Sequence, residues 1–298
     1  MSAERHLLLT VRQYVPMQHD VDDLVDLLDL EAIEVNIFRG VSPDESRQRI
    51  FGGQVAGQAL VAAARTVDDD RPVHSLHAYF LRPGDPSVPV LYEVDRIRDG
   101  RSFTTRRVVG IQHGRAIFNL AASFHIREAG LEHLEPMPDV PKADDLPTRS
   151  ERFAEDGVDD PFSDHPHPLD IRYITTSPLK RREPLPPVQQ VWFRADGKLP
   201  DNQVLHTCLL TYASDMTLLD TTLLPHGSGA ADQTVQMASL DHAMWFHGEF
   251  RADEWLLYDQ HTPASTGARG LATGRVFTHD GRLIASVVQE GLIRKVPA

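Results

Sequence analysis

The sequence predicts an α+β protein built from two tandem copies of one unit, each a helix packed on a curved antiparallel sheet. Three anchors occur in both halves in the same order: HAYF and HAMW at His77 and His242, LYEV at Leu91 with the second leucine of LLYD at Leu257, and turn glycines at Gly114 and Gly281. A period of about 165 residues is far longer than the period of a solenoid repeat, so it indicates a duplicated domain. Two such units are expected to join their sheets side by side, with each helix on one face.

The anchors and the composition divide the chain into an N-terminal arm over 1–20, a first unit over 21–127, a proline-rich acidic connector over 128–187 and a second unit over 188–298. In the first unit, periodicity and turn residues predict helices over 21–30 and 51–67, strands over 34–39, 74–81 and 88–99, and a hairpin over 102–125. In the second unit they predict a strand over 189–195, a helix over 205–224, apolar runs over 235–247 and 254–263, and a hairpin over 268–294. The prolines of the connector break any long element there.

The predicted helix over 51–67 opens with two glycines and is rich in alanine. Gly52, Gly53 and Gly57 would lower the stability of the helix unless packing required them. Small side chains let a neighbouring element approach the helix backbone closely. We therefore expect this helix to be pressed against a sheet rather than to lie on the surface.

Composition excludes several classes of protein. The chain has 298 residues and a net charge of −13, which argues against nucleic acid or an anionic membrane as a partner. Cys208 is the single cysteine, so an internal disulfide and a multi-cysteine metal site are excluded, and a reducing, cytoplasmic setting is expected. No apolar run approaches the roughly 20 residues of a membrane helix. In the connector, Asp164, His165 and His167 resemble a metal cluster, but the adjacent prolines favour a solvated loop.

Three polar residues of the second unit are candidates for a working site. Asp215 lies at the flank of the apolar face of its predicted helix, where a carboxylate is costly unless it is paired or used. Gln289 shares a strand face with apolar neighbours, so its amide is expected to be buried, and Ser239 opens a predicted strand. The repeat aligns Gln289 with Ala122 and Ser239 with His74, so the polar set belongs to the second unit only. We therefore expect one site per chain, although each residue also fits a structural role.

The chemistry of this set differs from that of the common hydrolase motifs. An Asp, a Ser and a Gln without a His form no serine triad, and the chain contains no G-x-S-x-G elbow, P-loop or dinucleotide fingerprint. An Asp can instead act as a general base on water while a hydroxyl and an amide hold the water in place. That arrangement would suit the hydrolysis of an activated ester.

Seven ordered motifs, FGGQVAGQAL, HSLHAYFLRPGD, RDGRSFTTRRV, LLTYASD, SLDHAMWFH, EWLLYD and ASVVQEG, resemble the acyl-CoA thioesterase II family of the TesB type. The resemblance covers about residues 24–294 and implies a double hotdog fold. It places the family's catalytic set on Asp215, Ser239 and Gln289, with Ser at position 239 where Thr is expected. It implies hydrolysis of acyl-CoA to a fatty acid and CoA, acyl-CoA as the substrate partner, no metal or organic cofactor, and a homo-oligomer, either a dimer or a tetramer.

Two other functions use the same fold. A non-catalytic acyl-CoA binder or sensor would need the pocket but not all three polar groups. A hydratase would use an Asp and a His such as Asp241 and His242, but neighbours on a strand face opposite sides of the sheet. Arg269 and the Arg106–Arg107 pair are candidates for binding CoA phosphates, with salt bridges on a strand face as the alternative.

Overall fold

The computed structural model describes residues 18–43, 49–155, 157, 168–175, 181, 183–229 and 232–296. Most of the predicted N-terminal arm lies outside these residues, as do Asp164, His165 and His167. Within the described residues, thirteen strands form one antiparallel sheet in the order β1-β2-β4-β5-β6-β3-β10-β13-β12-β11-β8-β7, and β9 pairs with β13.

The strands of the first half are β1 (Glu31–Glu34), β2 (Ile37–Gly40), β3 (Val73–Phe80), β4 (Val90–Asp99), β5 (Phe103–Gln112) and β6 (Arg115–His125). The others are β7 (Leu169–Tyr173), β8 (Val188–Ala195), β9 (Val235–Ser239), β10 (Asp241–Phe246), β11 (Leu256–Thr266), β12 (Arg269–Thr278) and β13 (Leu283–Lys295). The helices are α1 (Gln18–Leu28), α2 (Gly52–Ala64), α3 (Arg149–Glu155) and α4 (Gln203–Ser214), with 3₁₀ segments η1 (Ala143–Asp145) and η2 (Leu219–His226).

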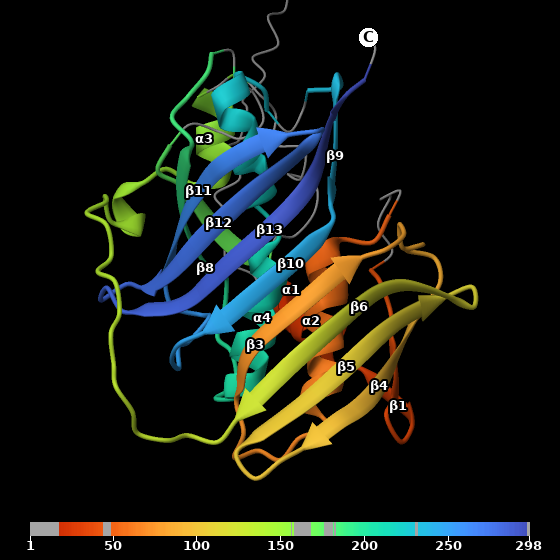
Figure 1. Ribbon diagram of the computed structural model, residues 1–298. Coiled ribbons are helices and arrows are strands. Elements are labelled where there is room, and N and C mark those ends of the chain that lie inside the picture. The colour runs from red at the N-terminus through yellow and green to blue at the C-terminus, as the bar shows by residue number, and fades with distance from the viewer. Residues whose placement is uncertain are drawn as a thin grey trace, which may run out of the picture.

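The two halves meet at the centre of the sheet, where β3 pairs with β10 in antiparallel register from Asp241↔Tyr79 to Trp245↔Ser75. Figure 1 shows this junction with α1, α2 and α4 on one side of the sheet. The side-by-side packing expected from the repeat is therefore confirmed. The limits of the predicted domains stay a prediction, and β7, which falls in the predicted connector, adds an edge strand next to β8.

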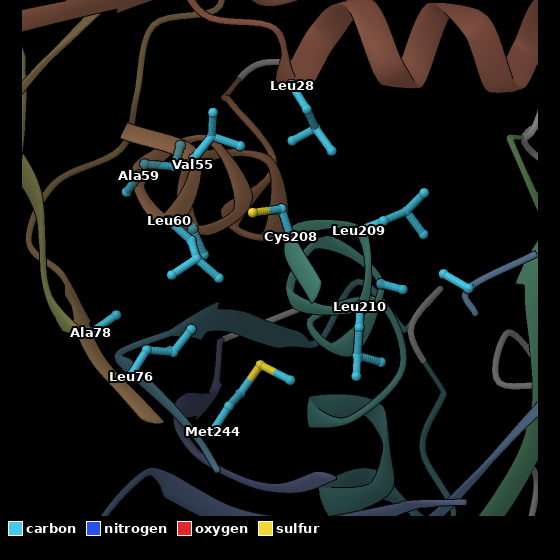
Figure 2. Close-up of a cluster of buried hydrophobic side chains, with 14 of the residues drawn as sticks. Leu28, Val55, Ala59, Leu60, Leu76, Ala78, Cys208, Leu209, Leu210 and Met244 are labelled. Carbon is cyan, nitrogen blue, oxygen red and sulfur yellow. The ribbon is translucent and has the colours of Figure 1, made fainter. Parts of the chain in front are cut away.

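The glycines of α2 bring it against α4 as well as against the sheet. Residues 53–63 of α2 are all buried. A Cβ added at Gly53 would lie 2.2 Å from the carbonyl oxygen of Tyr212, and one at Gly57 would lie 3.2 Å from that of Cys208. Figure 2 shows Cys208 pointing from α4 toward α2, and Leu60 pointing from α2 toward β3. The small residues that favoured a closely packed helix thus allow the two central helices to touch backbone to backbone.

Two predicted elements are wrong in their bounds. The strand expected over 34–39 contains the turn of a hairpin, at Asn36 with a positive φ of 64°, and only its residues from Ile37 on are a strand, in β2. The helix expected over 205–224 ends at Ser214. The hydroxyl groups of Thr211 and Ser214 bond to backbone carbonyls of the last turns, and the chain continues as the 3₁₀ segment η2.

Candidate active site

A cavity of about 570 Å³ lies at the junction of the two halves. Its wall combines the start of α2 and the end of β3 from the first half with the end of α4, the start of η2 and the end of β9 from the second. Most of the wall is apolar, and the polar side chains in it include Asp215 and Ser239. This combination of an apolar cavity and a few convergent polar groups is typical of a ligand site.

The structure brings the three predicted residues together. Asp215 is the C-cap residue, directly after the last residue of α4. Its Oδ1 accepts a hydrogen bond of 3.1 Å from the Ser239 hydroxyl and another from the Gln289 Nε2 amide. Ser239 lies at the end of β9 rather than at the start of a strand, because the predicted run over 235–247 is interrupted at Leu240. Gln289 is fully buried, as its strand pattern predicted, and supports the carboxylate from the sheet.

The first half supplies the other side of the carboxylate. A Cβ added at Gly52, the first residue of α2, would lie 2.6 Å from the Oδ2 atom of Asp215, so only glycine leaves room for this oxygen. The backbone N–H of Gly53 donates a hydrogen bond to Asp215. Asp215 therefore sits at the carbonyl end of α4 and at the N–H end of α2. The partial positive charge of the latter stabilises an anion there.

Burial is the main influence on the basicity of Asp215. It raises the pKa of the carboxyl to about 6, while the hydrogen bonds from Gln289, Ser239 and Gly53 act in the opposite direction. A carboxylate with this pKa is ionised at neutral pH and is a stronger base than an ordinary aspartate. The arrangement can thus hold a water molecule and remove its proton.

Sequence reasoning missed a second carboxyl group in the cavity wall, that of Asp220 in the first turn of η2. Burial raises its pKa to about 6; nearby Arg181 lowers the pKa and Asp215 raises it. Arg181 also holds the backbone, since its Nη1 donates to the Asp220 carbonyl oxygen at 3.1 Å. The signal available in the sequence was an acidic residue flanked on both sides by leucine and threonine, LLDTTLL.

The arginines proposed from the sequence for CoA phosphates are held elsewhere. Arg106 is buried and pairs with Asp99 at 2.5 Å, and Arg107 and Arg269 pair with carboxylates at 3.0 and 2.8 Å. The arginines that line the cavity are Arg49 and Arg82. Both are exposed, and each also donates to a backbone carbonyl, of Met237 and Ala116 respectively.

Asp241 and His242, the pair considered for a hydratase, do not lie on one side of the sheet. Asp241 accepts the backbone N–H of Glu290 at 2.6 Å, whereas His242 is fully buried on the opposite side of its strand, as alternation predicted. Burial raises the pKa of the Cys208 thiol to about 12, which leaves it protonated at neutral pH.

The part of the chain that the structure describes contains no group of three or more residues able to hold a metal ion. None of the helices described there has the length and apolar character needed to cross a membrane.

Comparison with known proteins assigns the family. A family model described as acyl-CoA thioesterase matches residues 173–292, and a model of the acyl-CoA thioesterase N-terminal domain matches residues 42–125. Acyl-coenzyme A thioesterase 8 of Mus musculus is 42% identical over 289 residues, covering 92% of this chain and 89% of its own. The structure of acyl-CoA thioesterase II TesB2 from Mycobacterium marinum is 47% identical with a TM-score of 0.75, over 91% of this chain and 98% of that one.

A more distant structure supports the fold alone. A protein of unknown function with a hot dog fold from Alicyclobacillus acidocaldarius has a TM-score of 0.73 at 21% identity, over 93% of this chain and 99% of that one. The double hotdog expected from the sequence motifs is therefore confirmed. With both halves matched by family models and a relative at 42% identity over nearly the whole chain, the protein belongs to the acyl-CoA thioesterase family.

Proposed function

We propose that the protein hydrolyses fatty acyl-CoA to a free fatty acid and CoA, with Asp215 as the general base. The observation that carries this proposal is the convergence of the Ser239 hydroxyl and the Gln289 amide on one oxygen of a partly buried carboxylate in the cavity wall. Two donors on Oδ1 fix the orientation of the carboxylate. Its raised pKa makes it basic enough to take a proton from water.

In the proposed reaction, Asp215 removes one proton from a water molecule as the water oxygen bonds to the thioester carbonyl carbon. The carbonyl oxygen becomes an oxyanion, which we assign to the backbone N–H groups at the start of α2 that have no partner within the helix, on the cavity wall. When the oxyanion collapses, the carbon–sulfur bond breaks and CoA leaves as a thiolate. Asp215 then returns the proton to sulfur, so no net proton stays on the enzyme.

Ser239 and Gln289 have different parts in this scheme. The Ser239 hydroxyl lies in the cavity wall and donates to Asp215, and its oxygen can still accept a hydrogen bond from the attacking water. Gln289 is fully buried and acts only on the carboxylate. Serine supplies the hydroxyl that threonine would supply, so the change at position 239 leaves the mechanism intact.

The cavity has room for part of an acyl chain, and its apolar lining suits one. Arg49 and Arg82 are the cations on the wall that we assign to CoA phosphates in place of the arginines proposed from sequence. We further propose that the protein acts in the cytoplasm as a homo-oligomer, a dimer or a tetramer. Sedimentation of the purified chain tests the oligomer.

The test is release of free CoA from palmitoyl-CoA, followed by thiol titration, with the native protein and Asp215→Asn side by side. We expect release by the native protein and none above background by the variant, while both bind acyl-CoA with similar affinity. Binding without release by the native protein, across a panel of acyl lengths, would instead identify a binder or sensor. Equal release by both proteins would place the base elsewhere.

A further inference from the structure

His242 is a fully buried polar residue for which the proposed mechanism has no role. It lies on β10, where Ala243 pairs with Val288 of β13, so the next pair in this register is His242 opposite Gln289. Both side chains are completely buried on the same face of the sheet. Directly opposed residues of antiparallel strands have Cβ atoms about 4.5–5.5 Å apart. The imidazole is therefore a direct neighbour of the carboxamide that holds Asp215.

The other side of the imidazole contacts the segment that carries Asp215. The His242 Nε2 atom is 2.8 Å from the hydroxyl oxygen of Ser214, the last residue of α4. The carbonyl of Ser214 accepts a hydrogen bond of 3.2 Å from the Tyr258 hydroxyl, which fixes the same residue from β11. His242 thus lies between the two structural supports of the catalytic carboxylate, the helix end and the buried glutamine.

Two polar atoms in this region lack a hydrogen-bond partner among the described residues. They are Nδ1 of His242 and Oε1 of Gln289, and both are buried. Buried polar atoms are nearly always hydrogen-bonded, directly or through water. Oε1 can only accept, so it requires a donor, whereas Nδ1 is a donor in one of the two neutral tautomers of histidine. Burial lowers the pKa of His242 to about 4, so at neutral pH the ring carries one proton, on one nitrogen.

We propose that His242 is a positioning residue whose Nδ1–H donates to Oε1 of Gln289, directly or through one water, while Nε2 accepts the hydroxyl proton of Ser214. This tautomer satisfies both unpartnered atoms at once, which the Nε2–H tautomer does not. The hydroxyl of Ser214 then gives its single proton to His242 instead of to the Thr211 carbonyl, 3.0 Å away. This inference rests on the proposed function.

The consequence concerns the orientation of the Gln289 amide. A carboxamide can rotate by half a turn and exchange its oxygen and nitrogen positions with little change in shape. In the flipped orientation an oxygen would face the Asp215 carboxylate, and the two acceptors would repel each other. A donor on Oε1 holds the Nε2–H group toward Asp215. Supports of this kind, one contact behind the reacting group, commonly set the geometry of a site.

Substitutions of His242 separate the two contacts. In His242→Asn, the amide nitrogen can occupy the place of Nδ1 and donate to Gln289, but no atom reaches Ser214. In His242→Gln, the amide reaches Ser214 but leaves the place of Nδ1 empty. His242→Leu removes both contacts. The matched control is His206→Asn, because His206 is also fully buried and its Nδ1 accepts the Ala252 backbone N–H, away from the cavity.

The measurement is the steady-state rate of acyl-CoA hydrolysis per folded molecule, with thermal unfolding as the check on folding. We expect kcat to fall about 10–100-fold in His242→Leu and His242→Gln, and less than fivefold in His242→Asn, with KM nearly constant in all three. His206→Asn should keep native kcat even if its unfolding temperature falls. Equal kcat in the Asn and Leu variants, with both folded, would overturn the inference.

A spectroscopic measurement tests the tautomer directly. With ¹⁵N-labelled histidine in the native protein, the signals lost in His242→Gln identify this ring, and the shifts and couplings show which nitrogen carries the proton. A protonated Nδ1 supports the inference, and a protonated Nε2 overturns it. The Asp215→Asn variant separates a failure of the proposed function from a failure of the role assigned to His242. If that variant stays active, the proposed function fails. If it is inactive while all His242 variants keep native kcat, only the role of His242 fails.

Discussion

The two halves of the molecule share one fold but treat their buried polar groups differently. In the first half, Gln58 of α2 is fully buried and completely satisfied. Its Oε1 accepts from the Tyr92 hydroxyl at 2.7 Å, and its Nε2 donates to the carbonyls of Leu27 and Val41. In the second half, Gln289 is equally buried but gives its amide to a carboxylate that faces a cavity, and its oxygen has no partner among the described residues. A complete hydrogen-bond set indicates a structural role, and an incomplete one beside a cavity indicates a functional role.

The largest effect should come from Asp215, for which the first half has no counterpart. Asp215→Asn preserves the shape but removes the base, so kcat/KM for acyl-CoA should fall about a thousandfold. The same substitution should raise thermal stability at pH 7, because burial makes the charged form unfavourable, and should have no such effect at pH 3 where both states are protonated. If Asp215→Asn lowered both stability and activity at pH 7, the carboxylate of Asp215 would not be destabilising in the native protein, and the prediction would be wrong.

The two buried glutamines offer the sharpest test of the comparison. Gln289→Leu should lower kcat about 10–100-fold with a modest effect on stability. Gln58→Leu should destabilise the protein by about 2–3 kcal/mol, because the Tyr92 hydroxyl and two carbonyls lose their partner, yet leave kcat per folded molecule unchanged. Chemical denaturation measures the free energy of unfolding of both variants, and steady-state kinetics measures their kcat. A Gln58→Leu variant with normal stability but low kcat would show that Gln58 has a functional role and not a structural one.

Ser239 tests whether the hydroxyl or the side-chain volume matters. Ser239→Ala should lower kcat about tenfold, since Asp215 loses one donor and the water loses a contact. Ser239→Thr keeps the hydroxyl and should stay within threefold of the native rate. Stopped assays at saturating acyl-CoA measure both, and a threonine variant as slow as the alanine variant would show that the methyl group cannot be accommodated.

The smallest effect is expected at Asp220, and it concerns pH. Activity should fall as the pH drops below about 6, because the base must be ionised and burial places the pKa of Asp215 there. Asp220 has its raised pKa at about the same value and lies close enough to interact with Asp215. Asp220→Asn should therefore shift the acid limb of the kcat profile to lower pH and make it less steep, with the rate at pH 8 within threefold of native. An unchanged profile would show that the two carboxyls titrate independently.

The architecture could be predicted from the spacing of the repeated anchors, and the family resemblance selected three residues that the structure brings together, although their catalytic role stays a prediction. A duplicated order of anchors implies a paired sheet, and the alternation of apolar residues on β13 predicts the buried face on which Gln289 lies. The end of α4 at Ser214 was missed because Met216, Leu219 and Leu223 continue the helical period of apolar residues, although Leu219 and Leu223 are buried by the 3₁₀ segment η2 instead of an α-helix. The turn at Asn36 was missed because its strands are only four residues long.

Contacts between segments far apart in the chain could not be derived. The role of Gly52 requires Asp215 to lie against the first turn of α2, which depends on the crossing of two helices from different halves. Arg49 and Arg82 reach the cavity wall through loops with no pattern of their own. In the sequence, Arg106 could not be distinguished from an arginine that binds phosphate. In the structure it is buried and bonds to Thr66 and Asp99.

The close approach of Gly52 to Asp215 limits the mutations that each half of the duplicated chain can tolerate. The first half, which does not carry Asp215, supplies the backbone that packs against the Asp215 carboxylate. Neither half can therefore accumulate mutations freely while the other retains the site. Either half expressed alone would contain only part of the site. We therefore expect a genetic screen to find null alleles in both halves, at Gly52 as well as at Asp215, the proposed base.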